Sequence, residues 1–131
     1  MHIKTSLNYS PNFSTSARNK KKIKYIILHY TGMRSETKAL KRLTDDSSNV
    51  SCHYFIKRNG QIILIVPELY EAWHAGKSKW KKDISINRNS IGVEITNKGH
   101  IFGYQNYTNK QISSLIKLTK YLIKKYKIKR S

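Results

Sequence analysis

The sequence predicts an α/β fold in which a mixed central β-sheet is flanked by helices. Two runs, 23–30 and 90–96, are dense in β-branched and aromatic residues, as buried strands are. An Asn59-Gly60 pair stands between two further apolar runs and indicates a β-hairpin. A long run with helical periodicity follows Thr108. This mixture of strands and helices is typical of a sheet covered by helices.

The first half of the chain supplies a strand, a helix and a hairpin. The strand 23–30 ends at a Thr-Gly pair, after which Ser35 can cap a helix over 36–43. The hairpin joins strands 51–57 and 61–66. Its Asn-Gly turn is expected to place both turn residues at positive φ, and a proline then ends the second strand.

The second half supplies a loop, the strand 90–96 and the clearest helix. Residues 70–89 have no sustained period and are expected to form a long structured loop. Thr108 and Gln111 have the spacing of a capping box. The apolar stripe that follows favours packing against the sheet over a membrane-surface helix. Its members are Ile112, Leu115, Ile116, Thr119, Leu122, Ile123 and Tyr126.

The length fits one domain, because domains commonly hold about 100–150 residues. Residues 1–22 have no apolar period and are expected to be an irregular lead-in to a domain over 23–131. The 26 Lys and Arg outnumber the 7 Asp and Glu and give a net charge of +19. Such a charge attracts nucleic acid, anionic lipid or an acidic wall polymer. It is spread along the whole chain, however, which favours a compositional bias toward Lys, Ile and Asn.

Several protein classes are not expected. No apolar run approaches the roughly 20 residues of a membrane-spanning helix, and the polar N-terminus does not resemble a signal peptide. We therefore expect a cytoplasmic protein, or a periplasmic one if an upstream segment is missing. The single Cys52 cannot form an internal disulfide. No helix-turn-helix, zinc-finger or RNA-recognition signature is present, so no nucleic-acid partner is expected.

Two residues stand out as chemical candidates. His29 lies at the carboxyl end of the strand 23–30, and such strand ends line clefts in α/β sheets. A ligand or base is plausible there, although a lone histidine is more often a hydrogen-bonded core residue. Glu94 has only apolar neighbours in the strand 90–96. Its carboxylate is either buried against a cation, a metal or water, or it simply faces outward.

A further candidate is the loop segment 72–76, with the sequence AWHAG. It joins Trp73 and His74 to small residues that include Gly76, which suits the wall of a sugar- or peptide-binding groove. The alternative is that Trp73 only attaches the loop to the core. His53, in a predicted strand, is expected to be a structural hydrogen bonder rather than a ligand.

Four segments taken together resemble a known family. They read IKYIILHYTGM (23–33), VSCHYFIKRNGQ (50–61), AWHAGKSKW (72–80) and INRNSIGVEITNKGH (86–100). Each segment alone is weak evidence, but their sequences and their order together are similar to those of the zinc-dependent N-acetylmuramoyl-L-alanine amidases. This type 2 amidase group is related to peptidoglycan recognition proteins and phage T7 lysozyme. The resemblance is closest to bacterial amidases that cut muropeptides, including anhydromuramoyl ones, in cell-wall turnover and recycling.

The resemblance implies a peptidoglycan-recognition or T7-lysozyme-like fold and a specific reaction. The family cleaves the amide between N-acetylmuramic acid and the L-alanine of the stem peptide. It uses Zn²⁺, which lowers the pKa of bound water to about 7. By resemblance, His29 is the first zinc ligand and Glu94 is the general base or the group that positions the water. The residues expected at the muropeptide groove are Trp73, His74, Gly76 and Asn97.

The sequence also departs from the family pattern. It stops before the family's GHxDIxPxRKxDPG-like segment, which carries the second His and the Asp of the zinc site. Only His29, one of three expected zinc ligands, has a counterpart. We therefore expect a domain that lacks its C-terminal portion, with the apolar face of the last helix less covered. Cys52 stands where the T7-lysozyme branch has a catalytic tyrosine.

Amide hydrolysis is the expected function, with two alternatives. One is an inactive fragment that binds muropeptides without zinc. The other is a basic nucleic-acid-binding protein, which a steep salt dependence of duplex binding would reveal.

Overall fold

A computed structural model describes residues 3–75, 85–103 and 105–129. Five strands form the main sheet in the order β1-β5-β4-β7-β3, and β2 pairs with β6 in a separate ribbon. The β4–β5 pair is antiparallel, whereas β1–β5, β4–β7 and β3–β7 are parallel, so the predicted mixed sheet is confirmed. The bounds are β1 Ser6–Leu7, β2 Phe13–Ser14, β3 Tyr25–Tyr30, α1 Glu36–Thr44, β4 Tyr54–Ile56, β5 Ile62–Leu64, β6 Glu71–Ala72, α2 Ile86–Asn89, β7 Ser90–Ile95 and α3 Asn109–Tyr126.

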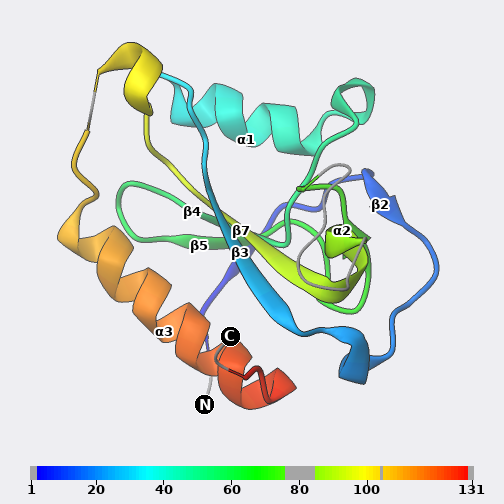
Figure 1. The fold of residues 1–131 in the computed structure, drawn as a ribbon. Coiled ribbons are helices and arrows are strands. Elements are labelled where there is room, and N and C mark those ends of the chain that lie inside the picture. The colour runs from blue at the N-terminus through cyan, green and yellow to red at the C-terminus, as the bar shows by residue number, and fades with distance from the viewer. Residues whose placement is uncertain (1–2, 76–84, 104, 130–131) are drawn as a thin grey trace.

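Helices α1 and α3 cover opposite faces of this sheet (Figure 1). Because side chains alternate along a strand, β4 supplies both cores: Tyr54 and Ile56 pack on the α3 side and Phe55 on the α1 side. On β7, Ile91, Val93 and Ile95 all belong to the α3-side cluster. The residues between them, including Glu94, therefore face α1. This alternation decides on which side of the sheet a site can form.

The strand β3 lies at the edge of the sheet and not in its centre. Among the described strands it pairs with β7 alone, and Leu28 and Tyr30 are each 49% exposed. The expectation of a buried strand was therefore wrong for β3. It holds for β7, which is flanked on both sides by β4 and β3. Both runs are equally rich in β-branched residues, so local composition could not separate edge from centre.

The hairpin between β4 and β5 is confirmed, but its turn differs from the expected one. The amide of Gly60 donates to the carbonyl of Lys57 (2.8 Å), so the turn spans residues 57–60. Gly60 has φ +87°, whereas Asn59 is not at positive φ. A turn closed by a left-handed glycine is the usual three-residue hairpin loop. A Cβ at Gly60 would also lie 2.9 Å from the carbonyl oxygen of Lys110.

The two long helices begin at the predicted caps. The Ser35 hydroxyl accepts from the Lys38 amide in α1, and Thr108 and Gln111 make both bonds of a capping box in α3. The buried face of α3 is rotated from the predicted stripe. The buried members are Gln111, Leu118, Leu122 and Tyr126, whereas Ile112, Ile116 and Ile123 are more than 40% exposed.

The described part of the N-terminal segment, residues 3–22, is less irregular than expected. These residues contribute β1, which extends the main sheet beside β5, and β2, which pairs with β6 so that Phe13 lies opposite Ala72. Two-residue strands leave no period to detect, which is why the sequence did not reveal them. No described helix has the length and hydropathy that a membrane-crossing helix requires.

Candidate functional site

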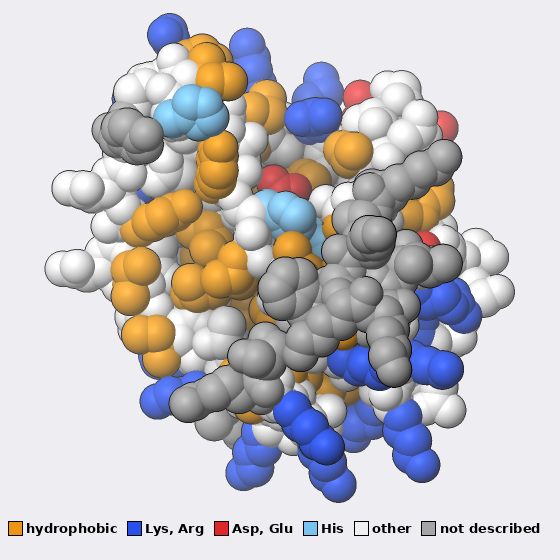
Figure 2. Space-filling view, viewed as in Figure 1, with side chains coloured by type: hydrophobic (Ala, Val, Ile, Leu, Met, Phe, Trp, Pro, Cys, Tyr) orange, Lys and Arg blue, Asp and Glu red, His pale blue; other side chains and the backbone are white. Residues whose placement is uncertain are grey.

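His29 and Glu94 stand directly opposite each other on the parallel strands β3 and β7. Both line a cleft of about 220 Å³ between the sheet and α1. In the space-filling view, acidic and histidine side chains lie together in a hollow of the surface (Figure 2). The other described residues that line the cleft are Tyr30, Thr31, Met33, Ala39, Arg42, Leu43, Val50, Ser51, Trp73 and His74.

The Glu94 carboxylate is held in an unfavourable environment for its charge. No donor within the described ranges forms a hydrogen bond with it, and burial raises its pKa from 4.5 to about 7, partly opposed by Arg42. A carboxyl group that titrates near neutral pH can both accept and return a proton there. Of the two positions that the sequence left open, burial against the cleft is therefore the correct one.

His74 is built into the wall of this cleft by two hydrogen bonds. Its Nδ1 lies 3.0 Å from Nε2 of His29, and its Nε2 lies 3.0 Å from the Ser90 hydroxyl. That hydroxyl already donates to the Ile86 carbonyl (2.5 Å), so it accepts from Nε2 of His74. Burial lowers the pKa of both histidines, for His74 to about 2. The neutral His74 therefore accepts from His29, whose acceptor nitrogen is Nδ1.

Gly92 makes room for the His74 ring. A Cβ at Gly92 would lie only 2.4 Å from Cγ of His74 and 2.7 Å from its Nδ1. Real Cβ atoms do not approach so closely, so a side chain at Gly92 would displace the ring. The glycine of the β7 strand thus positions His74, and through it His29.

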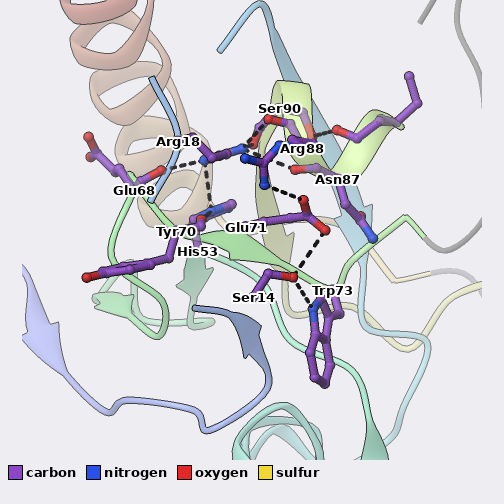
Figure 3. Close-up of polar contacts among 11 residues, drawn as sticks. Ser14, Arg18, His53, Glu68, Tyr70, Glu71, Trp73, Asn87, Arg88 and Ser90 are labelled. Atoms are coloured by element: carbon purple, nitrogen blue, oxygen red, sulfur yellow. Dashed lines mark hydrogen bonds and ion pairs between the residues drawn. The ribbon is translucent and has the colours of Figure 1, made fainter. Parts of the chain in front are cut away.

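Behind the cleft, His53 and Arg18 form a buried polar network (Figure 3). The Gly92 amide donates to Nδ1 of His53, so Nε2 carries the proton and donates to the Tyr70 carbonyl (2.7 Å). Burial lowers the pKa of His53 to about 3, which keeps it neutral. His53 is thus the structural hydrogen bonder that the sequence predicted.

Arg18 fixes the entry to β7 from a segment expected to be irregular. Its guanidinium donates to the carbonyls of Asn87, Arg88 and Ser90 at 2.7–3.1 Å, and also to the carbonyl of Glu68. Only 4% of Arg18 is exposed. The sequence gave no signal for this role, because Arg18 stands at the start of a run of basic residues that looks like solvated surface.

Of the other predicted site residues, one lines the cleft, one does not, and one lies outside the described residues. Trp73 lines the cleft but is also held in place, since its amide donates to Ser51 and its Nε1 to Ser14 (3.2 Å). Asn97 does not line the cleft, and its side chain bonds the Gln105 carbonyl and the Gly99 amide instead. Gly76 lies outside the described residues.

The described residues do not by themselves form a complete zinc site. Zinc in proteins is held by at least three side-chain ligands. Within residues 3–75, 85–103 and 105–129, no group of three His, Cys, Asp or Glu side chains gathers in a metal-binding arrangement. The Nδ1 atom of His29 is one suitable ligand, whereas both nitrogens of its neighbour His74 are engaged in hydrogen bonds.

A larger hollow of about 560 Å³ lies beside Glu68 at the base of α3. The Glu68 carboxylate accepts from Tyr54, Tyr126 and Lys125, the last at 2.7 Å. These donors satisfy the carboxylate and anchor the end of α3. Glu68 therefore serves the fold, and the cleft with His29 and Glu94 is the stronger candidate for chemistry.

Comparison with known proteins gives a family match over residues 19–131, to N-acetylmuramoyl-L-alanine amidase. Among curated proteins, N-acetylmuramoyl-L-alanine amidase AmiD of Escherichia coli (strain K12) is 36% identical over 120 residues, which are 82% of this chain and 42% of AmiD. The chain thus spans about two fifths of the length of the curated relatives that it matches.

Solved structures agree on the fold. A selenomethionine derivative of AmpD superposes with a TM-score of 0.78, covering 97% of this chain and 78% of that one at 24% identity. The complex of E. coli AmiD with anhydro-N-acetylmuramic acid-L-Ala-D-γ-Glu-L-Lys has a TM-score of 0.72 and 34% identity. It covers 88% of this chain and 48% of that one.

Proposed function

We propose that this chain, which belongs to the N-acetylmuramoyl-L-alanine amidase family, hydrolyses the amide between N-acetylmuramic acid and L-alanine in muropeptides. The observation that carries the proposal is the pairing of Glu94 with His29 in one cleft. The anhydromuramoyl peptide bound by AmiD supports a muropeptide as the substrate class. Such a reaction belongs to cell-wall turnover and recycling.

In this proposal Glu94 moves the proton of the reaction. With a pKa of about 7, its carboxylate accepts a proton from the attacking water near neutral pH. The protonated carboxyl then donates to the nitrogen of the departing L-alanine, so that the carboxylate is restored. Trp73 and His74 form the wall beside these groups and limit how the peptide can lie.

Zinc is the cofactor that the family resemblance implies, with His29 as its ligand in this chain. The described residues supply no second and third ligand beside His29, so the steps proposed for this chain are those of Glu94. The incomplete set of zinc ligands among the described residues also supports a second candidate function, a module that binds muropeptides without cleaving them. Muropeptide binding that a chelator leaves unchanged, with no release of peptide, would favour the binding module.

The test of hydrolysis is the variant Glu94→Gln, which keeps the size of the side chain and removes the base. We expect turnover of a muramoyl tripeptide to fall by about 100-fold or more, the usual scale of general acid–base catalysis. Glu71→Gln is the matched control, since Glu71 is a half-buried carboxylate paired with Arg88 (3.4 Å) outside the cleft. Equal turnover in Glu94→Gln and wild type would remove Glu94 from the mechanism.

A further inference from the structure

We infer that Arg42 forms a subsite in the cleft for a free carboxylate of the stem peptide, the α-carboxylate of a γ-linked D-glutamate. The inference rests on the proposed function and deepens it, because it names a feature of the ligand that the cleft selects. Glu94 cannot make this selection because a carboxyl group carries no positive charge, and Nε2 of His29 is already engaged with Nδ1 of His74.

The backbone of Arg42 is held in place by the packing of its helix. Its helix, α1, is anchored to the sheet by Ala39 and Leu43, which are 3% and 4% exposed. The Ser48 hydroxyl donates to the backbone carbonyl of Arg42 (2.5 Å) and fixes the last turn of the helix. The Arg42 side chain is exposed and lines the same cleft as Glu94. A rigid backbone below a solvent-facing guanidinium suits recognition of a ligand.

The guanidinium of Arg42 is also free to bind. Among the residues that the structure describes, no carboxylate or carbonyl accepts a hydrogen bond from it, although the other arginines are engaged. Two of the other described arginines bind oxygen atoms of the backbone or of an amide: Arg18 donates to four backbone carbonyls, and Arg58 donates to the Gln111 side chain. The remaining two are Arg34, which lies over the Phe102 ring, and Arg88, which pairs with the Glu71 carboxylate. Of the described residues that line the cleft, Arg42 is also the one with a side chain of fixed positive charge.

The chemistry of a muropeptide supplies a matching anion. The AmiD ligand contains L-Ala-D-γ-Glu, and linkage through the γ-carboxyl leaves the α-carboxylate of that glutamate free. Consecutive Cα atoms are about 3.8 Å apart, so this carboxylate lies roughly 6 Å from the amide that is cleaved. If that amide lies against Glu94, a carboxylate at this separation can still lie within the same cleft, which Arg42 also lines. Guanidinium and carboxylate pair through two parallel hydrogen bonds, which gives direction as well as attraction.

The experiment compares two ligands that differ at one group. They are N-acetylmuramoyl-L-Ala-D-γ-Glu-L-Lys and the same tripeptide with the glutamate α-carboxylate converted to the amide. Binding is measured by calorimetry to the full chain in the presence of a chelator, which suppresses hydrolysis, with chromatography to confirm that the ligand stays intact. The variants are Arg42→Gln and, as a matched control, Lys41→Gln, which removes one charge from the same helix outside the cleft.

We expect wild type and Lys41→Gln to bind the carboxylate form about tenfold more tightly than the amide, equivalent to about 1.4 kcal/mol. Arg42→Gln should bind both forms equally, and Arg42→Lys should fall between because a lysine does not pair in parallel. Unfolding curves of each variant verify the fold. Equal binding of both ligands by wild type, or a preference retained in Arg42→Gln, would overturn the subsite and leave the proposed function standing. Failure of wild type to bind either ligand would instead overturn the proposed function, and the subsite with it.

Discussion

Glu94 should make the folded protein less stable as the pH rises, and Glu94→Gln should remove that cost. Burial raises the pKa of Glu94 from 4.5 to about 7 in the folded state. Below pH 4.5 the carboxyl is protonated in both states and has no effect. Between the two values the unfolded chain loses this proton while the folded one keeps it, so stability falls as pH rises. Above pH 7 the carboxylate is charged in both states and the full cost is present.

The size of the effect follows from the shift in pKa. Each unit corresponds to about 1.4 kcal/mol, so a rise from 4.5 to about 7 costs about 3 kcal/mol above pH 7. Domains of this size are commonly stable by about 5–15 kcal/mol, so a cost of this order is readily measured. Most of it should develop between pH 5 and pH 8.

The assay is urea unfolding of wild type and Glu94→Gln at pH 5 and pH 8, in the presence of a chelator. The lowered pKa values of His29, His53 and His74 act in the opposite direction. Because of them the folded protein becomes less stable as the pH falls below 6.5, the usual pKa of histidine. They are present in both proteins, so the difference between the two isolates Glu94. The gain of the variant should grow by about 2–3 kcal/mol from pH 5 to pH 8.

Glu71→Gln is again the control, because Glu71 is paired with Arg88 and should show no alkaline gain when it is neutralised. A Glu94→Gln variant whose advantage over wild type is the same at pH 5 and pH 8 would refute the reasoning. In that case the Glu94 carboxylate is solvated or paired in solution.

Two further predictions concern the parts that surround Glu94. Gly92→Ala should lower the free energy of unfolding by about 1–3 kcal/mol because its Cβ would clash with the His74 ring at 2.4 Å, and the same change should cost less in a His74→Ala background. A cost that is equal in both backgrounds would show that the ring is not the obstacle. The purified 131-residue chain should retain well under one equivalent of zinc after dialysis, since the described residues offer His29 without a complete ligand set. Metal analysis that finds stoichiometric zinc would show that other residues complete the site.

Local signals in the sequence predicted the helices α1 and α3 and the hairpin strands β4 and β5 well, but not β6 and α2, which lie in the segment 70–89 that was expected to be a loop. Caps such as Ser35 and Thr108 act through hydrogen bonds to residues three positions away, so their effect is visible in a short window. The edge position of β3 depends instead on which strand lies beside it, and no local pattern reports that. The same holds for β1, a two-residue strand that exists only because β5 offers it a partner.

The candidate site was also predicted only in part. Residues with a local mark in the sequence were found, and residues whose role depends on the fold around them were not. His29 and Glu94 were identified by the resemblance and by an acidic residue among apolar ones. Arg18 and Arg42 carry no such mark, because a buried arginine that binds carbonyls and an exposed one in a cleft both read as ordinary basic residues. Asn97 was expected at the groove, but its side chain supports the loop that follows β7.

The position of Glu94 argues for a function more strongly than its identity does. β7 lies between β4 and β3, and Ile91, Val93 and Ile95 bury its α3 side. An apolar residue at Glu94 would satisfy the α1 side equally well and would avoid a cost of about 3 kcal/mol at neutral pH. Unlike Glu68, whose carboxylate accepts from three donors that hold α3, Glu94 has no described donor that would make it useful to the fold. Glu94 thus destabilises the fold without holding any part of it in place, and it stands opposite His29 in a cleft. A carboxyl group in that position suits proton transfer to and from a bound ligand.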